Sequence, residues 1–179
     1  MTDLPSQEHR RIARLPNREL EALLVRGDTP DLDGLLDWEY FGANTVWTAP
    51  LLGILRFLKG FGRRPDSGEA FGWNTPVERG GLDEPWRAQP SESQPKRFGW
   101  FAVGPVDATA ADNRYLHAVL LDYGRGGNPK ADPSGLIRDY VVRVEPGSDD
   151  LLLGKAYFAV GPLRIPVSYF VLERRRRLD

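Results

Sequence analysis

Polar side chains that could do chemistry stand among the alternating apolar residues near the end of the chain. In residues 137–144, alternation puts Asp139 and Arg143 on one face of an extended strand and Tyr140 on the other. A buried charge among aliphatic neighbours must pair or shift its pKa, because an isolated buried charge is too costly. Such a group can anchor a ligand or move a proton. Alternation does not fix which face is interior, so surface charges or a structural ion pair remain the alternative.

Two later strands carry further candidates of the same kind. Lys155 and Tyr157 share a face with leucines, and Tyr169 falls with Val167 and Val171. A carboxyl or phenol within hydrogen-bond reach of a substrate can act as a general acid or base. We therefore predict acid–base roles for Asp139, Tyr140 and Tyr157, and polar ligand contacts for Arg143 and Tyr169.

Aromatic residues are abundant, with 5 Trp, 6 Tyr and 8 Phe. Their side chains commonly line cavities that hold flat or apolar ligands, although they are also ordinary core residues. His117 alternates with apolar residues, and a lone histidine in that setting is more often structural than catalytic. The further ligand contacts that we predict are Trp38, Tyr40, Trp73, Asn74, Trp100 and His117.

Several functions are disfavoured by what the sequence lacks. It contains no cysteine, which excludes a thiol nucleophile, a thiolate metal site and disulfides. Its two histidines, His9 and His117, are far apart, and it has no Gly-x-Ser-x-Gly or nucleotide-binding motif, so we expect neither metal nor cofactor. The formal net charge of −1 gives no general attraction to nucleic acid. No signal-peptide or transmembrane pattern is recognised, which predicts a cytoplasmic protein. The oligomeric state is left open.

The elements that must position these residues are mainly β-strands. Residues 135–174 read as three strands separated by Gly/Pro turns at 145–149 and 160–162. Four further strands are expected upstream, at 33–42, 69–76, 97–104 and 115–123. Seven to eight strands with short connections favour an antiparallel meander that closes into a barrel, because closure removes exposed edges. A barrel of that size can hold one small ligand.

The remaining segments are expected to surround a single domain at residues 16–174. Residues 1–15 suggest a mobile lead-in and 175–179 a solvated basic tail. A helix is expected at 16–27, between Pro16 and Gly27. A second, strongly apolar helix at 48–61 is expected to plug the barrel, or alternatively to dock on a membrane or partner. Residues 78–96 form a long loop that is either a lid or an insertion without a role.

This order of elements resembles the calycin superfamily, the lipocalin-like and fatty-acid-binding-protein-like barrels with their bacterial relatives. The resemblance spans residues 32–174, and it is carried by LDGLLDWEYFG, LKGFG, GWN, VLLDYGRGGNP and GLIRDYVVRV…LLLGKAYF…YFVLER. It implies a meander barrel around an apolar cavity for a lipid, pigment or similar molecule, and a few members are isomerases or cyclases.

Two features depart from that superfamily's patterns. The lipocalin Gly-x-Trp signature is not matched, since the nearest text, Gly34 to Trp38, has the wrong spacing. The haem-binding nitrobindin-like branch has a proximal histidine in its last strands, and this chain has none there. Haem ligation of that type is therefore not expected.

We accordingly expect a mainly β, antiparallel meander barrel of about seven or eight strands, with an N-terminal helix and an apolar plug helix, that binds a hydrophobic small molecule. Two alternatives stay open. One is a cyclase or isomerase that acts on a small apolar substrate in the same cavity. The other is a non-catalytic interaction or membrane-surface module without a sizeable cavity.

Overall fold

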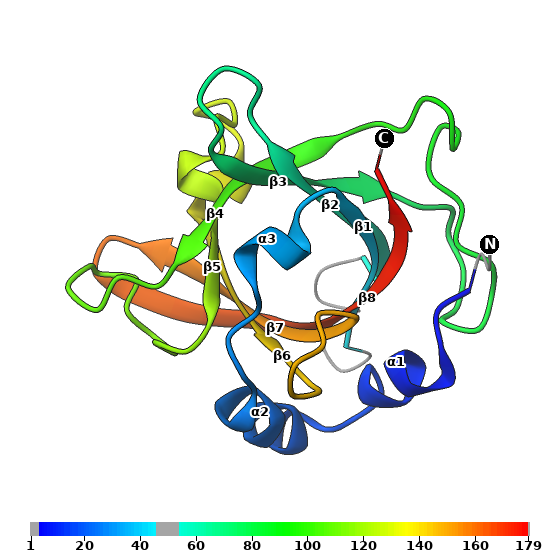
Figure 1. The fold of residues 1–179 in the computed structure, drawn as a ribbon, viewed down its shortest axis with the longest axis horizontal. Helices are drawn as coiled ribbons and strands as arrows, with labels where there is room; N and C mark the ends of the chain where they lie inside the picture. The colour runs from blue at the N-terminus through cyan, green and yellow to red at the C-terminus, as the bar shows by residue number, and fades with distance from the viewer. Residues whose placement is uncertain (1–3, 46–53, 179) are drawn as a thin grey trace.

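Eight strands form a closed antiparallel barrel in the part of the chain that the structure, a computed structural model, describes, residues 4–45 and 54–178. Neighbouring strands pair in sequence order, and β1 pairs with β8 to close the ring (Figure 1). This confirms the predicted meander barrel. The strands are β1 (Trp38–Asn44), β2 (Arg56–Arg63), β3 (Ala70–Pro76), β4 (Phe98–Pro105), β5 (Val119–Asp122), β6 (Ile137–Arg143), β7 (Leu151–Val160) and β8 (Leu163–Arg177).

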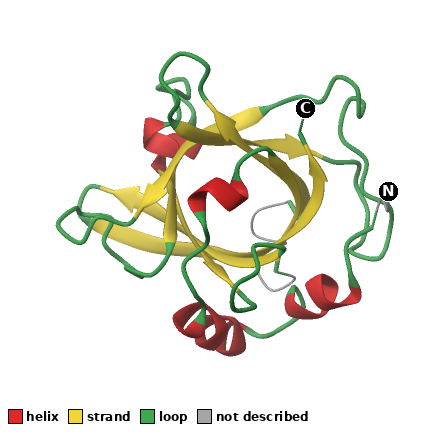
Figure 2. Cartoon of the chain, viewed as in Figure 1, coloured by secondary structure: helices red, strands yellow, loops and turns green. Residues whose placement is uncertain are grey.

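The helices are short. They are α1 (Gln7–Ile12), α2 (Asn17–Arg26), α3 (Leu32–Leu35) and the 3₁₀ helices η1 (Tyr123–Arg125) and η2 (Pro133–Leu136). Helices α1 and α2 lie outside the ring of strands, and α3 lies over its opening (Figure 2). The helix expected at 16–27 is confirmed as α2, which starts after Pro16 and ends before Gly27. None of the helices within the described residues has the length and hydrophobicity needed to cross a membrane.

The barrel wall is apolar on both faces. Its inner face carries one buried cluster, which includes Phe61, Phe101, Val141, Leu152 and Leu172. Its outer face carries a second cluster, which includes Leu58, Leu153 and Val171 and is covered by α1, α2 and the segment 78–96. Each strand in that region buries both of its sides, so its sequence does not alternate cleanly between apolar and polar residues.

Residues 56–63 form β2 and not the plug helix predicted at 48–61; residues 48–53 lie outside the described part of the chain. The apolar residues that seemed to surround a helix alternate across the wall, with Phe57 and Phe61 inside and Leu58 outside. Position 60 of this strand requires a glycine, because the ring of Trp73 in β3 lies across it. A Cβ at Gly60 would come within 2.5 Å of that ring.

The barrel end is instead capped by α3, which crosses the opening in the view of Figure 1. Its residues were predicted as the start of the first strand. Asp37 adopts a φ of 62°, which interrupts the extended chain, so the strand begins at Trp38. Leu35 and Leu36 are buried in the apolar core inside the barrel and close this end of it.

The first and last described segments of the chain are packed against the barrel. In place of a mobile lead-in, α1 buries His9 and Ile12, and His9 Nε2 lies 3.3 Å from the carbonyl oxygen of Val171 in β8. In place of a solvated basic tail, β8 continues through Arg177, and the Arg175 guanidinium contacts a Glu39 carboxylate oxygen at 2.6 Å. Glu39, distant in sequence, supplies the counter-charge that makes burial of this arginine possible.

The long loop 78–96 covers the outer wall. Trp86 and Leu82 within it are buried. Arg56 of β2 donates hydrogen bonds to the carbonyl oxygens of Gly81 and Glu84 at 2.9 and 3.1 Å, which holds the loop against the barrel. The loop is therefore part of the packed structure.

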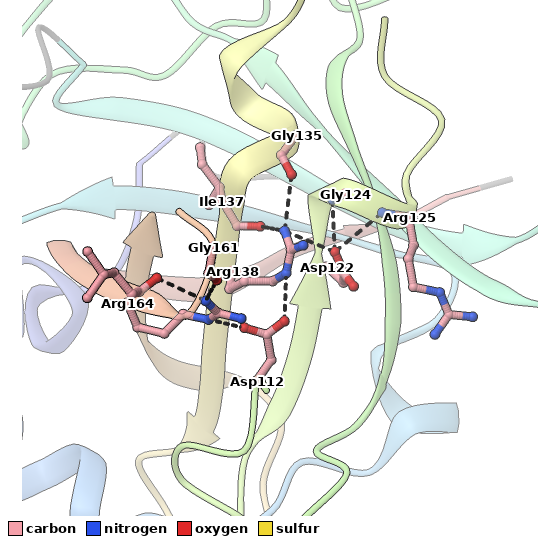
Figure 3. A network of polar contacts seen from close by, with 10 residues as sticks. Asp112, Asp122, Gly124, Arg125, Gly135, Ile137, Arg138, Gly161 and Arg164 are labelled. Atoms are coloured by element: carbon pink, nitrogen blue, oxygen red, sulfur yellow. Dashed lines mark hydrogen bonds and ion pairs between the residues drawn. The ribbon is translucent and has the colours of Figure 1, made fainter. Parts of the chain in front are cut away.

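A polar network joins the hairpin of β7 and β8 to β6 and to the loop after β4 (Figure 3). Asp112 accepts hydrogen bonds from Arg164 and from Arg138, the latter at 3.1 Å. Arg138 also pairs with Asp122 at 3.1 Å, and Asp122 caps η1. These contacts fix η1 and η2, which carry Tyr123 and Ser134 to the barrel interior.

Candidate functional site

The barrel contains a cavity of about 180 Å³ toward the end opposite α3. Most of its wall is apolar, with side chains such as Phe57, Ile137, Phe158 and Phe170. Polar groups are few and converge on one part of the wall, where Lys59, Asp139, Tyr123 and Asn74 meet. An apolar pocket with a few convergent polar groups is the usual form of a small-molecule site.

Strand register brings these four residues, the inner cluster, together. Lys59 of β2 stands directly opposite Asn74 of β3. Asp139 of β6 points inward because it shares the face of Val141, which belongs to the inner core. Tyr123 follows β5 at the start of η1, and Asp122 caps that turn by accepting hydrogen bonds from backbone amides. The cluster thus combines four separate elements of the barrel.

Hydrogen bonds connect every member of the inner cluster. Lys59 Nζ donates to Tyr123 Oη at 2.7 Å and contacts Asp139 Oδ2 at 3.3 Å. Tyr123 Oη donates to the same oxygen at 3.2 Å. Asn74 Nδ2 donates to Tyr123 Oη at 3.1 Å and to the Gly99 carbonyl oxygen at 3.1 Å. A shift in any one of these side chains therefore affects the others.

Burial governs the electrostatics of the inner cluster. The side chains of Lys59 and Asp139 are 1% and 4% exposed. Burial lowers the pKa of Lys59, and the nearby Asp139 opposes that change only in part. Burial raises the pKa of Asp139, again opposed in part by Lys59, and it raises the pKa of Tyr123 well above its ordinary value. The shifts in the pKa values of Lys59 and Asp139 each favour the neutral form of the side chain.

Aromatic rings surround the Lys59 amine. Its Nζ lies 4.5 Å from the centre of the Phe101 ring and 5.3 Å from that of Phe170. These rings exclude water from the deep end of the cavity and leave the amine in contact with the carboxyl, the phenol and ring faces. The amine is held in place by packing as well as by hydrogen bonds.

Two polar atoms on the cavity wall have unused hydrogen-bonding capacity. Neither Asp139 Oδ1 nor Ser134 Oγ has a hydrogen-bond partner within residues 4–45 and 54–178, and both atoms are buried. Both residues line the cavity. Leaving a buried polar atom unpaired costs about 1–3 kcal/mol, so each of these atoms calls for a partner. A ligand that donates a hydrogen bond to Asp139 Oδ1 would supply one.

The mouth of the cavity is apolar and borders a second hollow. Ile54 and Phe98, at the mouth, are 43% and 36% exposed. The second hollow, of about 550 Å³, is also bordered by Ile54, Phe57 and Phe98, and it is lined by the basic residues Arg56 and Arg79. Part of a longer ligand has room there, outside the barrel.

Of the predicted site residues, the structure places Asp139 and Asn74 in the cavity wall. The tyrosines that we predicted in the closing strands, Tyr140, Tyr157 and Tyr169, belong instead to the apolar cluster on the outer face of the wall. Tyr157 and Tyr169 belong to an outer cluster under α2, whose members are Glu21, Tyr115, Lys155, Tyr157 and Tyr169. The alternation was predicted correctly, but these tyrosines line the face that α2 covers.

The remaining predicted contacts also lie away from the cavity. Trp38 and Tyr40 are near α3, and Tyr40 donates to the Asp149 carbonyl oxygen at 3.2 Å. Arg143 forms a bidentate pair with Asp149, at 2.6 and 2.8 Å. His117 Nε2 lies 3.0 Å from the carbonyl oxygen of Leu24 near the end of α2.

Trp73 and Trp100 pack together on the outer face, with ring centres 5.7 Å apart. Trp73 alternates with the inward-facing Asn74, so it points away from the interior. Together with Phe71 these tryptophans form an aromatic cluster outside the barrel wall.

Sequence reasoning missed Lys59 and Tyr123. Lys59 fell within the helix predicted at 48–61, and no role was assigned to it. A strand reading of the same run would have placed Lys59 on the face of Phe57 and Phe61, and this was the available signal. Tyr123 was noted only for its alternation with His117, and nothing in the sequence showed that a 3₁₀ turn would aim it inward.

Comparison with known proteins gives no family for this chain, because no family model, curated protein or solved structure matches it. Among the described residues, no group of three or more His, Cys, Asp or Glu side chains is arranged to hold a metal ion. The functional argument therefore depends on the cavity and its inner cluster.

Proposed function

We propose that the barrel binds a small, mainly apolar molecule that carries a hydrogen-bond donor. The observation that carries this proposal is an apolar cavity lined by Asp139, whose buried Oδ1 has no hydrogen-bond partner among the described residues. A hydroxyl or N–H group on a ligand would pair with this oxygen, while the rest of the ligand packs against Phe57, Ile137 and Phe170. The donor fixes the ligand's orientation and the apolar wall supplies most of the affinity.

The cavity size restricts the ligand. An engineered apolar cavity of about 150 Å³ takes a benzene molecule, so about 180 Å³ suits a single ring with a small substituent. A long-chain fatty acid would have to extend past Phe98 into the adjoining hollow. Membership of the calycin superfamily is part of the same proposal, supported by the eight-stranded antiparallel barrel. The cytoplasmic location stays a prediction.

The first test is native mass spectrometry of the freshly purified protein, followed by organic extraction of any molecule that remains bound. We expect a small ring compound or a similarly sized apolar alcohol. A retained long-chain lipid as the only molecule would contradict the size argument.

A matched pair of probes tests the role of the donor. Benzyl alcohol and toluene have rings of the same size, but only the alcohol can donate to Asp139 Oδ1. Leaving a buried acceptor unsatisfied costs about 1–3 kcal/mol, so we expect the alcohol, which supplies a partner, to bind about tenfold more tightly in calorimetric or NMR titrations. Asp139→Asn should reduce this preference. Asp37→Asn is the control, because Asp37 is exposed and asparagine tolerates its positive φ.

Asp139 also favours a second candidate function, an isomerase or cyclase. Burial raises its pKa and its side chain lines an apolar cavity, a setting in which enzymes place carboxyl groups that exchange protons. In this candidate function, Asp139 takes a proton from a carbon next to a carbonyl and returns it farther along the substrate. Lys59 or Tyr123 would stabilise the oxygen that gains charge in between.

Isomerisation of cyclohex-3-enone to its conjugated isomer tests this second function, because the substrate is a single ring and the product absorbs ultraviolet light. We expect Asp139→Asn to abolish turnover and to keep most of the affinity for the ketone. Binding of the ketone without turnover in the unaltered protein would leave only the binding function. The interaction-module alternative has lost support, because residues 56–61 of its predicted docking helix are buried in β2.

A further inference from the structure

Lys59 is the amine at the deep end of the cavity, and its position is unusual for a lysine. The side chain is 1% exposed, lines the cavity and ends among aromatic rings. The chain has only four lysines, at positions 59, 96, 130 and 155. Lys96 and Lys130 are exposed, and Lys155 lies on the outer wall, so Lys59 alone faces the cavity.

The surroundings of Lys59 suit an amine that reacts as a nucleophile. A lysine is nucleophilic only in its neutral form, and burial in an apolar site favours that form. The neighbouring Asp139 carboxyl is buried as well, and burial favours its protonated form. A neutral amine and a protonated carboxyl are the two groups that imine formation needs, one to attack a carbonyl and the other to assist the loss of water.

We propose that Lys59 captures a small apolar aldehyde as an imine inside the barrel, with Asp139 as the proton donor. This inference rests on the proposed binding function, since the aldehyde must first enter the same cavity. It specifies the ligand further, as a ring-sized carbonyl compound. In this proposal Asp139 Oδ1, which has no hydrogen-bond partner among the described residues, pairs with the oxygen of the captured aldehyde.

The step balances within the inner cluster. Lys59 Nζ forms a bond to the aldehyde carbon, and the electron pair of the C=O double bond moves to oxygen. That oxygen takes a proton released by the nitrogen, which gives a neutral carbinolamine. The protonated Asp139 then donates a proton to the hydroxyl, water leaves, and the nitrogen forms the C=N bond. The products are a protonated imine and an Asp139 carboxylate beside it as counter-ion.

Lys155 provides an internal comparison. Its Nζ contacts a Glu21 carboxylate oxygen at 2.7 Å and Tyr115 Oη at 3.1 Å. Burial alone would lower the pKa of Lys155, but these hydrogen bonds outweigh it and raise the pKa. Lys155 is therefore held as an ammonium ion, which does not attack carbonyls. Selective reaction at Lys59 follows from its position in the cavity.

The test uses benzaldehyde and sodium cyanoborohydride at neutral pH, which convert an imine into a stable benzyl adduct. Intact-mass spectrometry counts the adducts, and peptide mapping assigns them to one of the four lysines. The neutral fraction of an amine at pH 7 rises about tenfold for each unit by which its pKa falls, so Lys59, whose pKa burial lowers, should be labelled faster than the exposed Lys130. Excess benzyl alcohol should slow labelling of Lys59 and leave Lys130 unaffected.

Variants separate this inference from simple binding. Lys59→Arg should remove the selective adduct, whereas Lys130→Arg should keep it; circular dichroism checks that each variant is folded. Asp139→Asn should slow labelling at Lys59 more than it weakens benzyl alcohol binding. If benzyl alcohol binds and Lys59 stays unlabelled, the imine is excluded and the binding function stands. If neither benzyl alcohol nor benzaldehyde binds, both proposals are wrong.

Discussion

Two polar clusters of similar chemistry lie on opposite faces of the barrel wall, each with a lysine, a carboxylic acid and at least one tyrosine. The inner cluster joins Lys59 to Asp139 and Tyr123 inside the barrel. The outer cluster joins Lys155 to Glu21 and Tyr115 beneath α2. In the outer cluster, the lysine and the acid are 13% and 37% exposed, against 1% and 4% inside.

The difference in burial reverses the direction of the pKa shifts in the two clusters. Outside, hydrogen bonds outweigh burial, so the pKa of Glu21 is lowered and that of Lys155 is raised, and both groups are held charged. Inside, burial outweighs the same kind of contacts, and the pKa values of Asp139 and Lys59 shift the other way. The outer cluster therefore behaves as a structural ion pair that attaches α2. In the inner cluster, burial instead shifts Lys59 and Asp139 toward their neutral forms.

The largest expected effect comes from breaking each pair. Asp139→Ala should lower the free energy of unfolding by about 3 kcal/mol, because it leaves the buried Lys59 amine without its carboxyl partner. Glu21→Ala should cost only about 1 kcal/mol, because water reaches its site. Urea denaturation of both variants measures the two costs. Equal losses would contradict the distinction between the clusters.

The pH dependence of stability should also differ in sign. Because the pKa of Asp139 is raised on folding, this residue contributes to the stability of the fold. The contribution is complete below the ordinary pKa of 3.8 and is lost as pH rises through the pKa of Asp139 in the folded protein. The lowered pKa of Lys59 contributes stability that is complete above pH 10.5 and is lost as pH falls through the pKa of Lys59 in the folded protein. The inner cluster thus stabilises the fold least at intermediate pH.

The outer cluster behaves in the opposite way. The lowered pKa of Glu21 stabilises the fold above 4.5, and this contribution is lost as pH falls through the folded value. The raised pKa of Lys155 stabilises it below 10.5, and this is lost as pH rises through the folded value. Urea denaturation from acidic to alkaline pH compares the unaltered protein with Lys59→Met/Asp139→Leu and with Glu21→Gln/Lys155→Met. Compared with the unaltered protein, the inner variant should gain stability as pH approaches neutral, and the outer variant should lose it. For the inner variant, the difference between neutral and extreme pH should be about 1.4 kcal/mol per unit of pKa shift removed.

Replacing both inner charges should have a smaller effect than replacing one. At neutral pH, Lys59→Met/Asp139→Leu should unfold within about 1 kcal/mol of the unaltered protein, since apolar residues of similar volume commonly match or exceed a buried ion pair. The same variant should lose its preference for benzyl alcohol over toluene. That combination would mean that the pair serves ligand chemistry and is not needed for stability. A loss as large as that of Asp139→Ala would show instead that the pair is structural.

Much of the fold could be predicted from the sequence, because strands with clear turns between them leave a strong local signal. The closing hairpins and β3 are examples. β2 left no such signal, since Phe57, Leu58 and Phe61 are buried on both sides of the wall and their pattern matches a buried helix. Local sequence cannot distinguish these two cases when the covering segment, 78–96, is itself irregular.

The candidate site was less predictable than the fold. Asp139 could be found because its strand alternates, and Asn74 was named, but the choice between faces needed knowledge of what covers the outer wall. Tyr140 and Tyr157 were chosen on the same reasoning as Asp139 and lie on the covered outer face. The partnership of Lys59 with Asp139 joins residues 80 positions apart, and only the closed barrel shows it.

The smallest structural change, loss of one hydroxyl, tests the tyrosines that belong to each cluster. Tyr157→Phe removes one hydrogen bond, with Tyr115 Oη at 3.0 Å, and should cost about 1 kcal/mol or less without changing the affinity for benzyl alcohol. Tyr123→Phe removes a hydroxyl that contacts Lys59, Asp139 and Asn74, so it should cost about 2 kcal/mol and weaken binding. Urea denaturation and calorimetry on both variants measure the two quantities. Because both substitutions delete a single hydroxyl from a buried ring, size changes cancel between them. If Tyr157→Phe weakened binding and Tyr123→Phe did not, the ligand site would lie on the outer wall beneath α2.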